Sequence, residues 1–157
     1  MRIILLIGRI CSGKTTYARK IMAEHQPAAL LSADELMQTL FPEPLGEKYD
    51  RYAARCKSYL YQQARKLAHQ GVTPVLDFGF WSKEDRREAA AALEGFELDW
   101  RYVDISMEEW ERRIQTRNAA VLEGTAPLET YYVDDGLKAK MNSRFEEPDE
   151  ISNMKRI

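Results

Sequence analysis

Residues 8–15 read Gly8-Arg9-Ile10-Cys11-Ser12-Gly13-Lys14-Thr15, and this stretch decides how the rest of the chain is interpreted. It fits the pattern G-x-x-x-x-G-K-[ST], which places two glycines, a lysine and a hydroxyl group at fixed spacing. An apolar, β-branched run at residues 2–7 precedes it, and residues 13–24 fit a helix. Glycines let the backbone turn its N–H groups inward, and a helix N-terminus adds positive potential. The sequence therefore predicts a strand, a phosphate-binding loop and a helix in succession.

The fixed residues of this P-loop, or Walker A, pattern have predicted roles toward ATP and Mg²⁺. Lys14 places its charge on the β- and γ-phosphates, and Thr15 offers its hydroxyl to the metal ion. The remaining expected nucleotide contacts come from Gly8, Cys11, Ser12, Gly13 and Thr16. The alternative is a plain glycine turn, which would need neither the lysine nor the second glycine. We interpret Cys11 as a small residue filling a tight turn rather than as a redox group.

Strand and helix patterns alternate along the rest of the chain. Apolar runs at 28–31, 74–78 and 98–105 predict further strands, and the tail has room for a short fifth strand. Helices are expected from Ser32 to before Pro42 and over 47–70, 82–93, 106–118 and 133–145. This alternation predicts parallel strands with right-handed crossovers, and therefore a three-layer α/β/α sandwich. We expect one domain over residues 1–157 with a lid around 113–132, because residues 119–131 contain Gly124 and Pro127 and show no period.

The composition fits a globular protein of the cytoplasm. The chain has 157 residues, of which 45% are hydrophobic and 31% charged, with a formal net charge of −2. This charge offers no broad basic stripe for a nucleic acid, so we do not expect a nucleic-acid partner. Two cysteines make no disulfide framework and fit a reducing compartment. No apolar stretch approaches the length of a membrane span, so we expect no membrane partner.

Two aspartates are placed to act on a nucleotide bound at the loop. Asp77 ends the 74–78 run, where an acid can hold the water shell of a metal ion, so we expect Thr15 and Asp77 to bind Mg²⁺. Asp34 follows the 28–31 run, near the crevice at the carboxyl ends of the strands. A carboxylate there can orient a hydroxyl and take its proton. The alternatives are a strand-end turn for Asp77 and helix-start chemistry for Asp34, although Ser32 and Glu35 already supply that cap.

Arg113 and Arg117 lie four residues apart and share one face of the predicted 106–118 helix. Two guanidinium groups beside the expected lid can bracket the phosphates and stabilise charge as the γ-phosphoryl group moves. The alternative is a solvated face that pairs with Glu108, Glu109 or Glu111. Aromatic residues are a further signal, and they either border the acceptor site or belong to the core: Tyr49, Tyr52, Phe78, Phe80 and Trp81.

With these residues placed, the chain resembles the small P-loop kinase-like ATP-binding proteins of the AAA-domain and zeta-toxin-like type, a group similar to chloramphenicol phosphotransferase and the kinase domain of polynucleotide kinase. The resemblance covers most of the chain and is carried by residues 8–15, 31–35, 75–81, 113–118 and 145–148. It implies a nucleoside-monophosphate-kinase-like sheet, Asp34 as catalytic aspartate, a lid at Arg113 and Arg117, and an adenine wall near residues 145–148. Polynucleotide-kinase-like members tend to carry a phosphate-gripping arginine three residues after this aspartate. Here that position is Met37, which favours a smaller, uncharged acceptor.

The leading hypothesis is a small-molecule kinase that transfers the γ-phosphoryl group of ATP·Mg²⁺ to a hydroxyl acceptor, with Lys14, Asp34, Arg113 and Arg117 as catalytic residues. The alternative is a nucleotide-dependent ATPase or switch that binds a partner and hydrolyses ATP slowly. A third idea, similar to zeta toxins, is a toxin kinase acting on a nucleotide sugar. The sequence holds no N-K-x-D motif, which disfavours a GTPase. A kinase and a switch differ in whether an acceptor accelerates ATP consumption.

Overall fold

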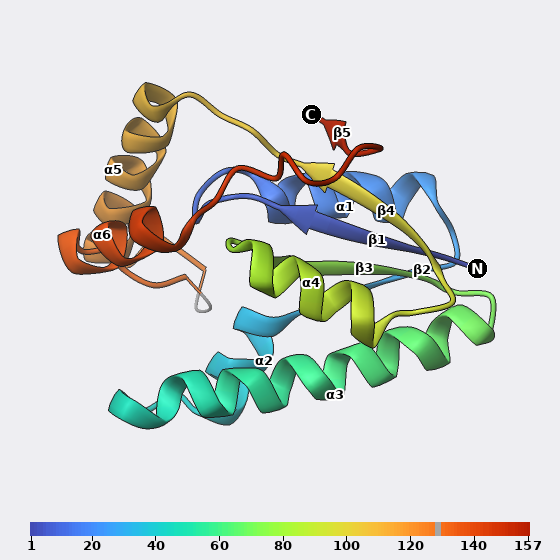
Figure 1. Cartoon of the computed structure of the whole chain (residues 1–157). Coiled ribbons are helices and arrows are strands. Elements are labelled where there is room, and N and C mark those ends of the chain that lie inside the picture. Colours follow the sequence, from blue (N-terminus) through green and yellow to red (C-terminus); the bar gives the residue numbers. More distant parts are fainter. Residues whose placement is uncertain (128–129) are drawn as a thin grey trace.

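The computed structural model describes residues 1–127 and 130–157, and it has helices on both faces of one sheet (Figure 1). The elements in chain order are β1 (Arg2–Ile7), α1 (Lys14–Glu24), β2 (Ala28–Ser32), α2 (Ala33–Leu40), the 3₁₀ turn η1 (Gly46–Lys48), α3 (Tyr49–His69), β3 (Thr73–Gly79), α4 (Lys83–Ala92), β4 (Glu97–Tyr102), α5 (Met107–Glu123), α6 (Asp135–Arg144) and β5 (Lys155–Arg156). No helix in the described ranges is long and apolar enough to cross a bilayer.

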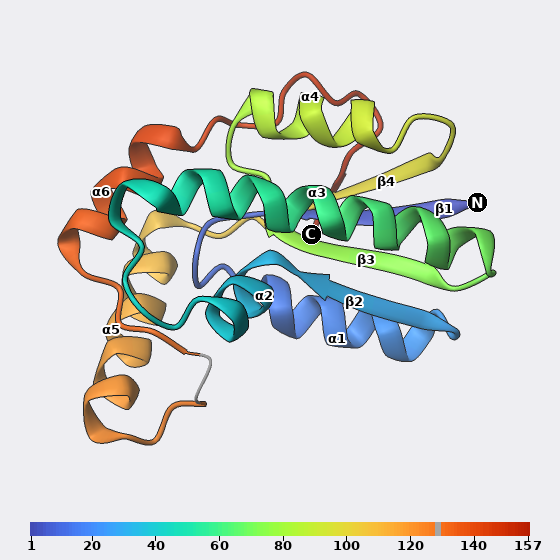
Figure 2. The ribbon, with the colours of Figure 1, turned by 90° about the horizontal axis from the view of Figure 1, so that it is seen from below.

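The strands form a parallel sheet in the order β2-β3-β1-β4-β5. The predicted three-layer α/β/α fold is confirmed: α1 covers one face, and α3 and α4 cover the other (Figure 1). The tail adds the short fifth strand, β5, whose Lys155 pairs with Arg101 of β4. Helices α5 and α6 lie at the end of the sheet toward which β1 points, and α2 lies between α1 and α3 in the view from below (Figure 2).

The core follows from the two-residue period of the central strand. Ile3, Leu5 and Ile7 of β1 belong to the apolar cluster formed with α3 and α4, whereas Ile4 and Leu6 pack against Ala18 and Ile21 of α1. Successive side chains of a strand point to opposite faces, so an unbroken apolar run must be covered on both. The same rule places Asp77 of β3 on the α1 side, two residues after Val75 of the α1 cluster.

The carboxyl end of β3 is irregular. Its register against β1 shifts after the Leu5–Leu76 pair, and Ile7 then pairs with Gly79. Gly79 and Phe80 both have positive φ, 81° and 46°, so the chain turns sharply as it leaves the sheet. Such a conformation is unfavourable for phenylalanine, but Phe80 is buried between Phe78 and Trp100 and its carbonyl accepts a hydrogen bond from the buried Arg86. The shift and the turn re-aim the backbone where β3 meets the phosphate loop.

The strand predicted over 98–105 ends at Tyr102, and the largest error in a predicted boundary concerns the helix that follows. The helix expected to end near Asn118 continues to Glu123 as α5, and Gly124 caps it with φ of 73°. The loop expected over 119–131 therefore begins at Gly124. Ala119, Ala120 and Leu122 are good helix formers, and a left-handed glycine is a common helix end. Within the expected lid, residues 128 and 129 lie outside the described residues.

Candidate functional site

A cleft of about 1420 Å³ opens where β1, β2 and β3 end. It is lined by most of the residues that the sequence singled out, namely Cys11, Ser12, Gly13, Lys14, Thr15, Thr16, Asp34, Asp77, Arg113 and Arg117. Gly8 does not line the cleft but is buried at the base of the loop, where a Cβ atom would lie 2.6 Å from Ser12 Oγ. The fold thus brings together groups that come from four separate segments of the chain.

The loop has the conformation that its glycines allow. Gly13 takes φ of 98° just before α1, and Cys11 takes φ of 60°. Helix α1 begins at Lys14, so the N–H groups of its first turn have no acceptor within the helix and face the cleft as donors. The Lys14 ammonium donates to the Arg9 carbonyl at 2.8 Å, which keeps its charge over the loop. The arrangement suits the phosphates of a nucleotide.

Helices α5 and α6 hold the loop from outside the sheet. The buried Trp110 donates its indole N–H to the Ile10 carbonyl at 2.6 Å, and the Ile10 N–H donates to the sulfur of Met141 at 3.2 Å. Arg113 donates to the Ser12 carbonyl at 2.8 Å. Sequence reasoning missed Trp110 and Met141, because nothing local to either residue signals a contact more than 90 residues away.

Thr15 and Asp77 form the candidate metal-binding pair. The Thr15 hydroxyl donates to Asp77 Oδ2 at 2.9 Å, and Asp77 is 9% exposed. Hydroxyl and carboxylate oxygens are ligands that suit Mg²⁺, which usually takes one or two protein ligands and completes its shell with phosphates and water. The described residues hold no group of three or more His, Cys, Asp or Glu that could bind a metal alone. The pair therefore fits a metal ion that arrives with a nucleotide.

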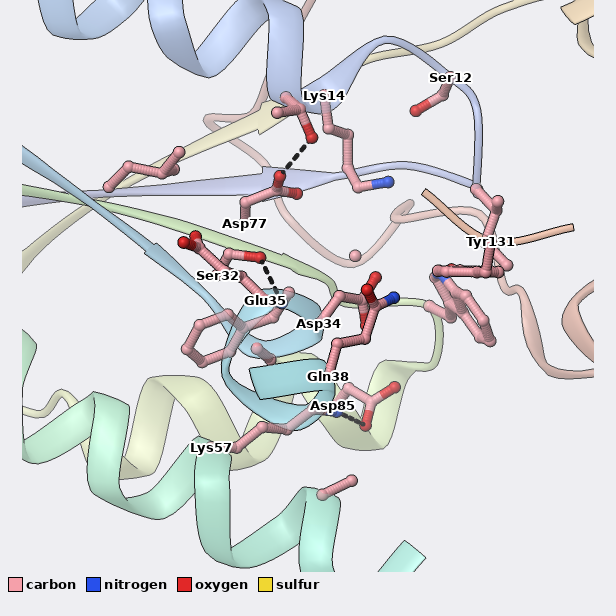
Figure 3. A pocket seen from close by; sticks show the side chains of 18 of the residues that line it. Ser12, Lys14, Ser32, Asp34, Glu35, Gln38, Lys57, Asp77, Asp85 and Tyr131 are labelled. Atoms are coloured by element: carbon pink, nitrogen blue, oxygen red, sulfur yellow. Dashed lines mark hydrogen bonds and ion pairs between the residues drawn. The ribbon is translucent and has the colours of Figure 1, made fainter. Parts of the chain in front are cut away.

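Asp34 lies across the cleft from Lys14 (Figure 3). The hydroxyl of Ser32 caps α2 by accepting the N–H of Glu35 at 3.2 Å, so Asp34 is not needed for the cap. The Asp34 side chain reaches solvent, but the walls of the cleft surround it and raise the pKa of its carboxyl group above the ordinary value. The charge of Asp77 adds to this rise, whereas those of Lys14, Lys57 and Arg117 oppose it. A carboxylate in this setting is a stronger base than an ordinary aspartate.

The two arginines of α5 have different surroundings. Arg113 pairs with Glu109 at 2.8 Å in addition to its bond to the loop, so part of the predicted ion-pair face exists. The hydrogen bonds from Arg112 and Arg113 lower the pKa of Glu109 to about 2. The Arg117 guanidinium lies 5.3 Å from the ring centre of Tyr131 and forms no ion pair with the described residues. Burial raises the pKa of the Cys11 thiol, and Arg117 opposes that rise.

The structure also divides the aromatic candidates. Tyr49, Phe78 and Trp81 line the cleft, whereas Phe80 is a core residue and Tyr52 packs on Phe41. Residues 145–148, the adenine wall implied by the resemblance, do not line the cleft. Phe145 instead stacks on Tyr102, and the guanidinium of Arg9 lies 4.1 Å from its ring centre.

Several cleft residues were not singled out from the sequence. They include Gln38, Lys57, Gln62, Asp85 and Tyr131. Gln38 follows Asp34 by four residues, so helical spacing would have placed it on the same face. Lys57 and Asp85 form an ion pair at 3.6 Å between α3 and α4, and no local sequence pattern predicts this pair.

Comparisons with known proteins agree with this fold. The family described as an AAA domain matches residues 3–148. No curated protein matches the chain. A solved structure of Kti12 from Chaetomium thermophilum in complex with ADP-AlF3 is 20% identical, with a TM-score of 0.71, and the match covers 99% of this chain and 88% of that one. The APS kinase of Mycobacterium tuberculosis, in complex with AMPPNP and APS, is 21% identical with a TM-score of 0.64 and coverages of 99% and 87%. A gluconokinase from Sinorhizobium meliloti is 14% identical with a TM-score of 0.58 and coverages of 99% and 80%. At these identities the likeness establishes the fold of P-loop kinases.

Proposed function

The chain belongs to the AAA-domain family, and we propose that it transfers the γ-phosphoryl group of ATP to a hydroxyl group of a small molecule. The observation that carries the proposal is that Lys14, Asp77 and Asp34 line one cleft at the carboxyl ends of the strands. Asp34 lies close enough to both other residues for their charges to change its pKa, which Lys14 lowers and Asp77 raises. Phosphate-binding groups and a basic carboxylate thus face each other across a space that holds a nucleotide and an acceptor.

In the proposed reaction the acceptor oxygen forms a bond to the γ-phosphorus, and the bond to the oxygen that bridges the β- and γ-phosphates breaks, so ADP leaves. Asp34 orients the attacking hydroxyl group and takes its proton onto a carboxylate oxygen. Lys14 and the N–H groups at the start of α1 hold the phosphates, and Arg117 neutralises charge on the transferring group. Arg113 does not contact the transferring group in this scheme. It positions the loop by donating a hydrogen bond to the Ser12 carbonyl.

Thr15 and Asp77 would hold Mg²⁺, directly or through its water shell. The ion, when bound, neutralises charge on the β- and γ-phosphates. Kti12 and the APS kinase were solved with nucleotides or analogues, which supports ATP as the phosphoryl donor here. Catalysis in this scheme comes mainly from positioning and from electrostatic stabilisation, because a loose phosphoryl transition state asks for little covalent chemistry.

The proposal is tested by acceptor dependence. Wild-type protein with ATP and Mg²⁺ is assayed for ADP release against a library of hydroxyl compounds, and the phosphorylated product is identified by mass spectrometry. Lys14→Ala is the control for the phosphate-binding loop: this variant should fold, bind ATP more weakly and lose turnover. At 100 Kd of nucleotide the wild type should gain roughly 2.7 kcal/mol in unfolding free energy. If ATP binds but no acceptor raises ADP release, a nucleotide-dependent switch replaces the kinase.

A further inference from the structure

The half of the cleft away from the phosphate loop, between α2, α3 and α4, is the acceptor side of the proposed kinase. Asp34 and Gln38 of α2 point into it, and Lys57 and Asp85 lie across from them (Figure 3). Further lining residues come from α3 and from the turn after β3, namely Tyr49, Ser58, Tyr61, Gln62, Arg65 and Trp81. The charges and polar groups of this surface determine which chemical class of acceptor it can take.

Each cation on the acceptor side already has a partner within the protein. Lys57 pairs with Asp85 at 3.6 Å, and Asp34 lies close enough for its pKa to respond to Lys57. Arg144, where α6 ends, pairs with Asp50 at 3.7 Å. Arg65 donates to the Ala92 and Glu94 carbonyls and stacks on Phe96. Among the described residues, the cations that line the acceptor side are therefore all engaged within the protein rather than left free for a carboxylate or phosphate of the acceptor.

The carboxylates of the acceptor side outnumber those cations. The acids of α2, α3 and α4 that line the cleft are Asp34, Glu35, Asp50, Asp85 and Glu88, against Lys57 and Arg65 of these helices and Arg144 of α6. The phosphate side has the opposite character, with Lys14, Arg113 and Arg117 around the loop. An anionic acceptor would be attracted to the phosphate side, which ATP occupies, and repelled from its own.

The rest of the acceptor side suits a ring that carries several hydroxyl groups. Gln38, Gln62 and Ser58 offer uncharged donors and acceptors, and the carboxylates of Asp34 and Asp85 accept from hydroxyl groups. The indole of Trp81 packs over Gly79, where a Cβ atom would lie 2.7 Å from its Nε1. Its ring and that of Tyr49 give flat apolar walls beside these polar groups. A neutral cyclic polyol fits these groups. Its hydroxyl groups can bond to the amides and carboxylates, while the faces of its ring pack against the aromatic side chains.

We propose that the acceptor is an electrically neutral cyclic polyol, a sugar or cyclitol, and that the paired cations of the acceptor side select against anions. The proposal rests on the proposed kinase function and narrows its substrate class. Specificity of this kind arises as much from the groups that repel the wrong ligand as from those that bind the right one.

The test measures kcat/KM for ADP release with a panel of neutral monosaccharides and cyclitols. Each is matched with a carboxylate counterpart and an amino counterpart that differ from it at one carbon. We expect the neutral member to be the best acceptor of its set, with kcat/KM at least about tenfold above that of the carboxylate, as for an unpaired charge in a polar site. A best acceptor that is an anion or an amine overturns the proposal. An anion would then direct attention to Arg19, a cation of α1 that lines the cleft.

A variant tests the cause of the selection. Asp85→Asn keeps an oxygen for the Ser82 N–H bond but removes the charge that neutralises Lys57. The preference for the neutral acceptor over the carboxylate should fall about two- to fivefold, the effect of one exposed ion pair. Glu84→Gln is the control, because Glu84 lies on the same helix but pairs with Arg87 outside the cleft. A preference that is unchanged in Asp85→Asn contradicts the role of the pair. If no panel member raises ADP release but another hydroxyl compound of the wider library does, this inference fails and the kinase function stands. If no compound of either set raises ADP release although ATP binds, the kinase function itself fails.

Discussion

Asp34 shows at the scale of one residue how a functional group opposes folding. Its carboxyl pKa is raised in the folded chain, so the charged form is disfavoured there relative to the unfolded chain. Below the ordinary aspartate pKa of about 3.9 the group is neutral in both states and has no effect on stability. As the pH rises through the folded pKa, the group ionises and its destabilising effect is complete. A base that is poised for proton transfer thus reduces the stability of the fold at neutral pH.

Asp34→Asn should therefore lose activity and gain stability. Transfer to an acceptor should fall by about 10²–10⁴-fold, the usual worth of a general base, while ATP affinity hardly changes because the loop is untouched. The melting temperature at neutral pH should rise above that of the wild type, and the difference should vanish below about pH 3.9. Steady-state kinetics, calorimetry and thermal melts at several pH values provide the measurements. Normal transfer by the variant would remove Asp34 from the mechanism.

The pH dependence of the wild type provides a separate check. In the proposed reaction the Asp34 carboxylate is the active form, so kcat/KM should rise with pH through the raised pKa of this group and then level off. The apparent pKa should lie above the ordinary aspartate value of about 3.9. The residual activity of Asp34→Asn should lack this acidic limb. A limb that persists in the variant would assign the titration to another group.

At the scale of the element, α5 presents two arginines from one face that we expect to act differently. Arg113 is bound to the Ser12 carbonyl and to Glu109, so Arg113→Ala should weaken ATP binding by loosening the loop. Among the described residues Arg117 donates to no loop carbonyl and pairs with no acid, and Arg117→Ala should lower kcat more than it weakens ATP binding, since its contact forms best in the transition state. Arg112→Ala is the control, because Arg112 is exposed and pairs only with Glu109. Equal losses of affinity and kcat in both variants would contradict this division.

The boundaries of α5 also show what sequence patterns can and cannot predict. Its start at Ser106 was predicted from the cap, and its end at Gly124 was missed because Ala119–Glu123 lacks an apolar period although its residues favour a helix. The alternation of strands and helices, together with residues 8–15, was enough to predict the layers. The position at the cleft of the loop residues, of Asp34 and of Asp77 was also predictable, because each comes at or directly after the end of a strand.

Contacts between distant elements were not predictable. Trp110 with Ile10, Lys57 with Asp85 and the stacking of Arg9 on Phe145 depend on how helices pack after the sheet forms. Local sequence does not indicate such pairs, because each of these side chains could equally well be exposed to solvent or packed in the core. The register shift at the end of β3 was missed for the same reason, because it arises from pairing with β1.

At the scale of the whole molecule, the chain beyond α6 runs back along the sheet to β5 (Figure 1), and one of its contacts is with a buried guanidinium. Arg86 of α4 is 2% exposed, donates to the Phe80 carbonyl at 2.8 Å, and pairs with Glu150. Through these bonds Arg86 links the turn after β3 to the segment that leads to β5. The Glu146 N–H adds a bond to the Trp81 carbonyl at 2.8 Å.

Arg86→Ala should therefore destabilise the whole fold. The half-exposed Glu150 loses its partner, and the buried Phe80 carbonyl loses its donor, which typically costs about 1–3 kcal/mol for one such group. Arg87→Ala, one residue along the same helix, removes an exposed pair with Glu84 and should cost under about 1 kcal/mol. Urea unfolding of both variants gives the two free energies. Similar values for the two would show that the buried guanidinium does not hold the C-terminal segment.

The attachment of the loop to α5 and α6 limits which segments of this protein can be replaced by those of a homologue. The carbonyls of Ile10 and Ser12 accept from Trp110 and Arg113, and the Ile10 N–H donates to Met141. A segment transplanted in place of residues 107–144 would have to supply an indole, a guanidinium and a sulfur at matching positions. Without them, backbone groups of the loop would lose their partners. Residues 107–144 and the loop are therefore not interchangeable modules, and viable recombinants should inherit both from the same parent.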